Sequence, residues 1–323
     1  MPRLLILLMF LTASPAQADM TRLVADHVLP RHEAFARSTA ALARAAEDTC
    51  DPGDLAPAYH AAYDDWLGLQ PIRVGPIEED GRGLAIAFWP DPKGLGLKAQ
   101  RALLEGDPAR LEPQAFAQQS VAARGLTGLE RLLFPQEPWP GETCSLIRAT
   151  SADLARLAAE LRDGWHDDFG PLLLSAGEPG NPRFLTQTEA RQVMFTQVIT
   201  ALEYLKDQRL GRPMGSFDRP APERAEARAS GRSLRNVTLS LGAIRDMVAT
   251  LSDKAPDTLA ALDRAIELAQ ALPDPVLAGV STPQGRLRIE ILQQAVDAAR
   301  QTALDELGPA LGVTVGFNAM DGD

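Results

Sequence analysis

Helical periodicity runs through most of this chain, and strand-like alternation is almost absent from it. Apolar residues recur at three- and four-residue spacing, which gives a helix one apolar face. The pattern covers residues 20–47, 55–69, 95–105, 113–134, 144–174, 186–210, 222–251, 255–271 and 285–307. Proline and glycine interrupt it between these segments, most clearly at 71–94, 135–141 and 273–283. The sequence therefore predicts an all-α protein.

The length of the chain predicts two domains, because 323 residues exceed what one hydrophobic core usually serves. The segment 177–182, Gly-Glu-Pro-Gly-Asn-Pro, disfavours both helix and strand and is the best boundary. We expect two four-helix-bundle-like domains, an N-terminal one over 19–176 and a C-terminal one over 183–323.

A short internal similarity would relate the two bundles as a pseudo-repeat. Thr-Gly-Leu-Glu-Arg-Leu at 127–132 returns as Thr-Ala-Leu-Glu-Tyr-Leu at 200–205. Glu130 and Glu203 would then occupy equivalent positions. Chance is the alternative, because Leu-Glu-x-Leu is common in helices.

Residues 1–18 have the order of a secretory signal peptide. Arg3 supplies the positive charge, 4–11 the apolar run, and Ala-Gln-Ala at 16–18 the small-residue cleavage site. The run is too short to span a bilayer, and no later segment has the roughly 20 apolar residues that a membrane helix needs. We predict cleavage after Ala18 and a periplasmic protein without a transmembrane segment; a short membrane anchor is the alternative.

The charge of the chain argues against some classes of partner. The formal net charge is −11 at pH 7. General binding of nucleic acid or of an anionic membrane needs a basic face, which this composition does not favour.

The chain has two cysteines, Cys50 and Cys144. Two cysteines in an oxidising compartment most often pair, and there is no Cys-x-x-Cys motif to suggest a redox or metal role. We expect a structural disulfide that joins the end of the first helix to the start of the helix over 144–174.

Six segments of the chain resemble, in order, the imelysin-like family (peptidase M75 and iron-regulated periplasmic proteins). Gly-Leu-Thr-Gly-Leu-Glu at 125–130 resembles the Gly-x-His-x-x-Glu helix of that family, with Thr127 at the histidine position. The other five are 59–76 with its Trp66 and Gly-Pro turn, 86–91, 206–215, 226–233 with Glu226, Ser230 and Ser233, and the Gly-Phe…Asp-Gly-Asp ending at 316–323. The resemblance implies two similar helical bundles that face each other, and a role linked to iron uptake.

Thr127 changes the chemistry that the motif can support. Histidine and glutamate at positions i and i+3 lie on one helix face and can reach one metal ion, whereas a hydroxyl is a poor ligand for zinc or iron. A zinc peptidase site needs about three protein ligands and an activated water. The four histidines, His27, His32, His60 and His166, do not supply the missing ligands by their spacing. The sequence therefore argues against metallopeptidase activity through this motif.

Glu130 is the motif carboxylate that remains. It is either an ordinary surface or ion-paired glutamate, or a carboxylate in a cleft between the two domains. Gly125 and Gly128 favour the cleft, because each costs a helix roughly 1 kcal/mol relative to alanine. Such residues are kept where another group approaches closely.

An arginine-rich segment follows in the second half. Its members are Arg209, Arg212, Arg219, Arg224, Arg228, Arg232 and Arg235. The last four have the 4, 4, 3 spacing of one helix face, and guanidinium groups bind carboxylates and phosphates through paired hydrogen bonds. We expect Arg228 and Arg232 to line an anion-tolerant cleft opposite Glu130. Ser230 and Ser233 would lie beside them; a solvated face paired with nearby glutamates is the alternative.

Asp321 and Asp323 end the chain. Carboxylate oxygens at this density suit hard cations such as Fe(III), Ca or Mg. A frayed acidic tail is the alternative reading.

Together these features predict an exported, non-catalytic protein that binds a metal ion, a metal chelate or a small anion. The candidate ligand-binding residues are Gly125, Thr127, Glu130, Glu226, Arg228, Ser230, Arg232 and Ser233, and the candidate metal ligands are Glu130, Asp321 and Asp323. The sequence does not identify a cofactor; iron or another divalent or trivalent metal is the candidate class. The alternatives are a metallopeptidase and a protein that binds a periplasmic or outer-membrane partner without a small ligand.

Overall fold

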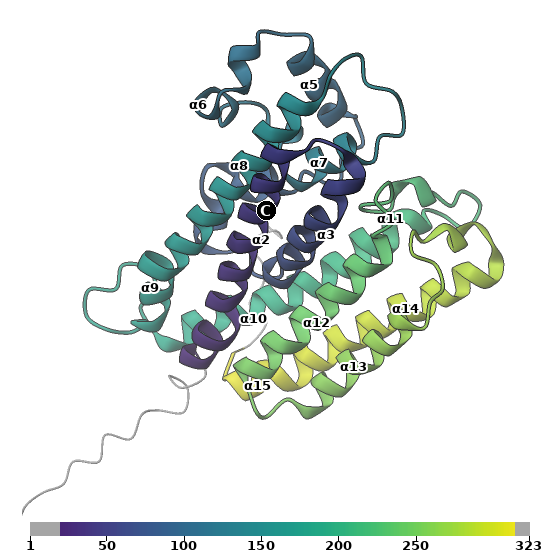
Figure 1. The fold of residues 1–323 in the computed structure, drawn as a ribbon. Helices are drawn as coiled ribbons and strands as arrows, with labels where there is room; N and C mark the ends of the chain where they lie inside the picture. The colour runs from purple at the N-terminus through teal and green to yellow at the C-terminus, as the bar shows by residue number, and fades with distance from the viewer. Residues whose placement is uncertain (1–19, 314–323) are drawn as a thin grey trace, which may run out of the picture.

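A computed structural model of the chain describes residues 20–313, and the regular elements in that range are helices (Figure 1). No β-strand occurs within these residues, so the prediction of an all-α protein is confirmed. Residues 1–19, with the predicted signal peptide, and 314–323, with Asp321 and Asp323, lie outside the described part. Within it, no helix combines the length and hydrophobicity needed to cross a membrane.

The first half of the chain forms a bundle of four helices, α2 (Leu29–Asp48), α3 (Pro52–Leu69), α7 (Gly125–Leu133) and α8 (Cys144–Asp163). α2 packs against both α3 and α8, and α7 closes the bundle against the same two helices. Short elements fill the chain between α3 and α7: η2 (Gly75–Gly81), α4 (Arg82–Ile86), α5 (Leu95–Leu104), η3 (Pro108–Leu111), α6 (Pro113–Phe116) and η4 (Val121–Ala123).

The second half forms a bundle of α10 (Gln187–Tyr204), α12 (Ser233–Leu251), α13 (Pro256–Gln270) and α14 (Pro283–Thr302). The two bundles lie side by side, with α12 packed against α3 of the first (Figure 1). Several helices continue through π-helical turns, namely η1 (Leu23–Val28) into α2, α8 through η5 (Gly164–Phe169) into α9 (Gly170–Leu174), α10 through η6 (Leu205–Leu210) into α11 (Gly211–Met214), and α14 through η9 (Ala303–Leu307) into α15 (Gly308–Leu311). Two 3-10 turns, η7 (Pro222–Arg224) and η8 (Ala278–Ser281), complete the described elements.

The buried apolar residues form two cores. One lies inside the first bundle and includes Phe35, Trp66 and Leu129. The other lies inside the second bundle, and it also takes in Leu23 and Trp165 from the first half of the chain. Each bundle thus has its own core, whereas a domain boundary at 177–182 and a pseudo-repeat between the halves stay predictions.

Polar side chains fix the starts of several helices. Asp51 precedes Pro52 and accepts hydrogen bonds from the backbone N–H of Gly53 at 2.8 Å, which caps α3. Thr186 caps α10 and Thr282 caps α14 in the same way. Side-chain oxygens at this position satisfy N–H groups that have no partner inside the helix, and proline is well tolerated in the first turn.

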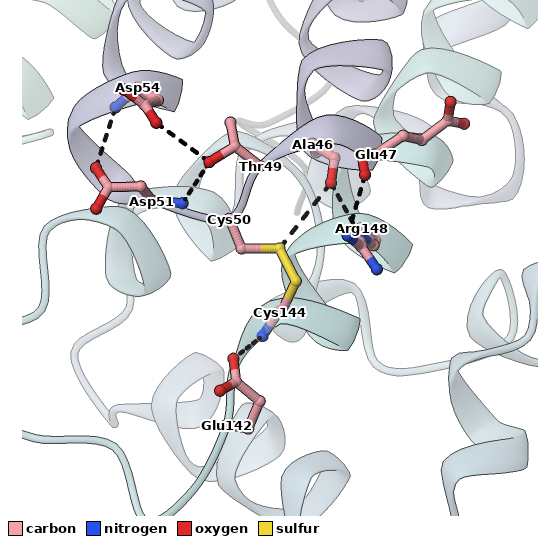
Figure 2. Close-up of a disulfide and its surroundings, with 9 residues drawn as sticks. All are labelled: Ala46, Glu47, Thr49, Cys50, Asp51, Asp54, Glu142, Cys144 and Arg148. Atoms are coloured by element: carbon pink, nitrogen blue, oxygen red, sulfur yellow. Dashed lines mark hydrogen bonds between the residues drawn. A yellow bond between two sulfur atoms is a disulfide. The ribbon is translucent and has the colours of Figure 1, made fainter.

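The expected disulfide is present. Cys50, just after α2, is bonded to Cys144, the first residue of α8, with Cα atoms 5.3 Å apart (Figure 2). Arg148 strengthens the same junction by donating from α8 to the carbonyl oxygens of Ala46 and Glu47, each at 3.0 Å. The bond closes a loop of 94 residues that contains α3 and α7.

One long helix that the sequence predicts is absent. Residues 113–134 do not form a single helix but divide into α6, η4 and α7. The prediction was wrong because Arg124 is extended and Gly125 takes a positive φ of 65°, which a right-handed helix does not allow.

Two buried histidines lie at the start of the first bundle. His27 and His32 are 1% and 3% exposed. His27 Nδ1 accepts from Arg31 Nε at 3.2 Å, and the His32 ring packs against Trp165 with centroids 5.5 Å apart. Burial lowers the pKa of His27 to about 3, with Arg31 and His32 acting in the same direction, and burial lowers the pKa of His32 to about 4.

Removing the disulfide should destabilise the fold. We expect a Cys50→Ser, Cys144→Ser double variant to lose about 2–4 kcal/mol in free energy of unfolding, because the unfolded chain regains the freedom of a long loop. Urea titration of both proteins under non-reducing conditions measures the loss. Equal midpoints for the two proteins would contradict the expectation; adding reductant to the wild type should reproduce the variant.

The stability should fall in acid through His27 and His32. Their folded pKa values lie below the unfolded value of about 6.5, so the unfolded chain binds more protons as the pH drops. The contribution of the two histidines to the free energy of unfolding is fully present above about pH 6.5. Below that pH it falls by up to about 1.4 kcal/mol per pH unit for each histidine, until the folded pKa of that histidine is reached. Urea unfolding at intervals from pH 7.5 to 4.5 measures this slope. A His27→Gln, His32→Gln variant should show a flatter dependence, and an unchanged slope would count against the assignment.

Candidate functional site

The motif helix α7 begins where the backbone of α4 passes closely. A Cβ atom on Gly125 would collide with the carbonyl oxygens of Ala85 and Ile86. A Cβ atom on Gly128 would lie 3.2 Å from Nε2 of Gln100, which donates to the Gly128 carbonyl at 2.9 Å. Both motif glycines are therefore explained by close packing, as the sequence predicts for Gly125 and Gly128.

Thr127 lies inside this packed region and is 5% exposed. Its Oγ1 accepts a hydrogen bond from the backbone N–H of Phe88 at 3.1 Å. Thr127 thus anchors the segment that follows α4, which carries Trp89. The Trp89 ring contacts Tyr204 of the second bundle edge-on, with centroids 6.2 Å apart, and the Arg212 guanidinium lies 5.9 Å from its centre.

Glu130 reaches from α7 to the second half of the chain. Its Oε1 atom accepts two hydrogen bonds from Ser230, one from the backbone N–H at 2.9 Å and one from Oγ at 2.8 Å. Burial raises the pKa of Glu130, while the two Ser230 hydrogen bonds act in the opposite direction. The structure therefore brings together Glu130 and Ser230, two predicted site residues 100 positions apart.

The segment that carries Ser230 is not helical. The sequence predicts a helix over 222–251 with four arginines on one face, but α12 begins only at Ser233. Ala227 has a φ of 50° and Gly231 a φ of 71°, and both values interrupt a right-handed helix. The prediction that Arg224, Arg228, Arg232 and Arg235 share one helix face is therefore wrong. Their side chains lie in different environments.

Arg232 is buried rather than exposed to a cleft. Its side chain is 2% exposed, forms an ion pair with Asp64 at 2.5 Å and lies 2.9 Å from Nδ1 of His60. The guanidinium also lies 4.6 Å from the centre of the Tyr63 ring. Arg235 pairs with the same Asp64 carboxylate from the surface. These two arginines therefore join α12 to α3.

Glu226 is buried in a second polar cluster. It pairs with Arg209 at 2.6 Å, with side chains 4% and 2% exposed, and accepts from Asn236 Nδ2 at 3.0 Å. Arg209 also donates to Ser240 and to Gln70 of the first half. Ser233 is buried nearby in sequence, and its hydroxyl has no hydrogen-bond partner within residues 20–313. Glu226 and Ser233 thus belong to the packed junction between the bundles.

A cleft of about 670 Å³ opens above this junction. Its walls come from the Trp89 segment, α7, α11 and the segment before α12. The lining residues are Trp89, Pro90, Asp91, Pro92, Glu130, Gln136, Arg212, Glu223, Arg224, Ala225, Ala227, Arg228 and Ala229. Of the predicted site residues, Glu130 and Arg228 line this cleft. Ser230 does not line it but donates two hydrogen bonds to Glu130.

The sequence missed three residues that shape this cleft. Trp89 and Gln136 lie in loops whose approach to α7 has no local signal. Arg212 belongs to the arginine-rich segment, but its spacing from Arg228 gives no reason to pair them. The position of Trp89 within a segment that resembles a family motif was the one available hint.

A larger hollow of about 970 Å³ lies elsewhere, between η2, η5 and the 177–182 segment. Its two arginines are already paired: Arg82 contacts Glu79 at 2.7 Å, and Arg183 contacts Glu78 at 3.2 Å. The smaller cleft, in contrast, contains Arg228, whose guanidinium has no ion pair or hydrogen bond within the described residues. Free guanidinium groups and the motif carboxylate make the smaller cleft the candidate site.

Comparison with known proteins decides the family. The imelysin (peptidase M75) family model matches residues 28–303, which span both bundles. The chain belongs to the imelysin family.

Relatives of this imelysin share its fold at low sequence identity. Iron-regulated protein A of Synechococcus elongatus is 23% identical over 269 residues, which cover 76% of this chain and 71% of that protein. The crystal structure of an imelysin-like protein from Psychrobacter arcticum has a TM-score of 0.77 and 18% identity, and covers 94% of this chain and 99% of that one. A Parabacteroides distasonis structure, provisionally described as an iron-regulated protein A precursor, has a TM-score of 0.69 and 14% identity, and covers 90% and 97%.

Metal ligands in this imelysin are sparse over residues 20–313. No group of three or more histidine, cysteine, aspartate or glutamate side chains is arranged there to hold a metal ion. His27 and His32 are buried in the core. Metal binding by Glu130 together with Asp321 and Asp323 stays a prediction, because the two aspartates lie outside the described residues.

Replacing Thr127 by valine should destabilise this imelysin. Valine keeps the shape but leaves the Phe88 N–H without its acceptor, which typically costs about 1–3 kcal/mol when the group is buried. Thr150→Val in α8 is the matched control, because the Thr150 hydroxyl only donates to Leu146 of its own helix at 2.7 Å. Urea unfolding should show a larger loss for Thr127→Val. Equal losses for the two variants would show that the Phe88 hydrogen bond contributes little.

Proposed function

We propose that this imelysin is a binding protein whose cleft between the two bundles takes a small carboxylate-bearing anion, metal chelates included. The observation that carries the proposal is the lining of one cleft by Arg212, Arg224 and Arg228 beside Glu130. Planar guanidinium groups match carboxylate oxygens through paired, charge-assisted hydrogen bonds. A pocket of several hundred Å³ is also the usual size for a small-molecule site.

The charges in the cleft favour an anion. The Asp91 carboxylate is engaged, since it accepts from the backbone N–H groups of Leu95 at 2.9 Å and Gly96 at 2.8 Å. Glu223 is paired with Arg224 at 3.8 Å. Arg212 and Arg228 therefore supply positive charge that no carboxylate of the described residues neutralises.

The link to iron is part of the proposal and rests on relatives. The Synechococcus relative is named for iron regulation, and so is the Parabacteroides one. A ferric chelate with free carboxylates would fit the charge of the cleft. The Cys50–Cys144 disulfide supports an oxidising compartment, and with the predicted signal over 1–18 it favours the periplasm. The proposal also includes two bundles related as a pseudo-repeat, with the cleft at their boundary.

The predicted site residues, together with Arg212, which the sequence missed, have different roles in this proposal. Arg228 and Arg212 would contact the ligand, and Glu130 would face it. Ser230 would hold Glu130 in place, and Thr127 would hold the segment that carries Trp89. Glu226, Arg232 and Ser233 would support the site through the packed junction.

Arg228 provides the first test of the proposal. We expect the mature wild type to bind citrate, alone or as its ferric complex, in isothermal titration calorimetry. Arg228→Ala should weaken this binding about tenfold or more, because a hydrogen bond to a charged group contributes about 1.5–3 kcal/mol. The fold should be unaffected, since Arg228 is exposed and pairs with no described residue.

Arg288→Ala is the matched control for this test. Arg288 is an exposed arginine of α14 that lines none of the clefts described above, and its loss changes the net charge equally. If the two variants weakened binding equally, the binding would be explained by the net charge of the protein and not by the cleft. No binding by the wild type, with a stable protein companion recovered from periplasmic extract, would favour a partner-binding role instead.

A further inference from the structure

The Glu130 carboxylate presents an acceptor to the cleft. Both Ser230 hydrogen bonds go to Oε1, from the backbone N–H at 2.9 Å and from Oγ at 2.8 Å. Oε2 makes no hydrogen bond or ion pair within residues 20–313. Since Glu130 is among the lining residues, Oε2 is the oxygen left to meet a ligand.

This acceptor is an obstacle for a ligand that carries only carboxylates. A carboxylate placed against Glu130 brings two like charges together, which costs several kcal/mol at an interface and leaves a lone-pair acceptor without a donor. A hydroxyl group removes both costs, because it donates a strong hydrogen bond to a carboxylate oxygen. The arginines that line the same cleft meanwhile favour anionic oxygens.

We infer that the ligand is a hydroxycarboxylate, which donates its hydroxyl to Glu130 Oε2 and places its carboxylates against Arg212 and Arg228. The inference rests on the proposed function and narrows its ligand class. Ser230 is the residue that makes the acceptor available: it fixes the carboxylate by occupying Oε1 with two donors and leaves Oε2 without a partner among the described residues. Glu130 then acts as a specificity-determining residue rather than as a source of affinity.

Two acids that differ by one hydroxyl test the inference. Citrate carries the hydroxyl, and tricarballylate (propane-1,2,3-tricarboxylate) has the same three carboxylates without it. We expect the metal-free wild type to bind citrate about tenfold more tightly than tricarballylate by calorimetry at neutral pH. Chelator-treated protein and metal-free acids are used, so that the hydroxyl is free to donate.

Glu130→Gln changes the acceptor into a donor without changing the shape. The amide oxygen can still accept from Ser230, and the amide nitrogen replaces Oε2. This variant should lose the preference for citrate and should bind tricarballylate as well as, or better than, the wild type. Arg228→Ala is the control: it should weaken both acids equally and leave their ratio unchanged. Thermal melting of each variant confirms that it is folded.

The outcomes separate the inference from the proposed function. Equal binding of the two acids by the wild type would overturn the inference and leave the anion-binding function intact. A citrate preference that survives in Glu130→Gln would also overturn it, since the hydroxyl would then be recognised elsewhere. If neither acid binds, the inference fails; the proposed function fails with it only if ferric citrate is not bound either.

Discussion

The burial of charge between the two bundles is the constraint on which the rest of the structure depends. Arg209 and Glu226 pair almost without exposure to solvent, and Arg232 pairs with Asp64 across the bundle junction. A buried charge that loses its partner destabilises a protein by about 3–5 kcal/mol, so these contacts allow little variation in how the bundles meet. The segment before α12 takes its non-helical path with Glu226 and Arg232 turned inward.

The same path forms the candidate site. Because the chain turns at Ala227 and Gly231, Ser230 reaches Glu130 while Arg228 stays exposed and lines the cleft. A continuous helix would have set Arg228 and Arg232 on one face and left Glu130 without its donors. One short stretch of backbone therefore contributes to both the bundle junction and the candidate site: its buried residues join the bundles, and its exposed residues line the cleft.

Helical periodicity with its proline and glycine interruptions was sufficient for the fold class, and motif resemblance was sufficient for the family. The cysteine pair was predictable because two cysteines in an oxidising compartment have few other roles. The site was only partly predictable. Glu130, Ser230 and Arg228 were identified, but the arginine spacing suggested a helix that Ala227 interrupts, and an alanine with a positive φ has no sequence signal. Trp89 and Arg212 meet only through tertiary packing. Thr127 was noted as a lost ligand, whereas its contact with Phe88 gives it a structural role.

Leu23 and Val24 lie in the core of the second bundle, which constrains the order in which parts of the chain can fold. These residues precede α12 in the sequence by most of the described chain, and they pack against it. Synthesis proceeds at about 5–20 residues per second, so α12 is made roughly ten seconds or more after Leu23 and Val24. Until then these two apolar side chains cannot be buried against it. A truncation that removes α12 would therefore expose Leu23 and Val24 in the first half of the chain.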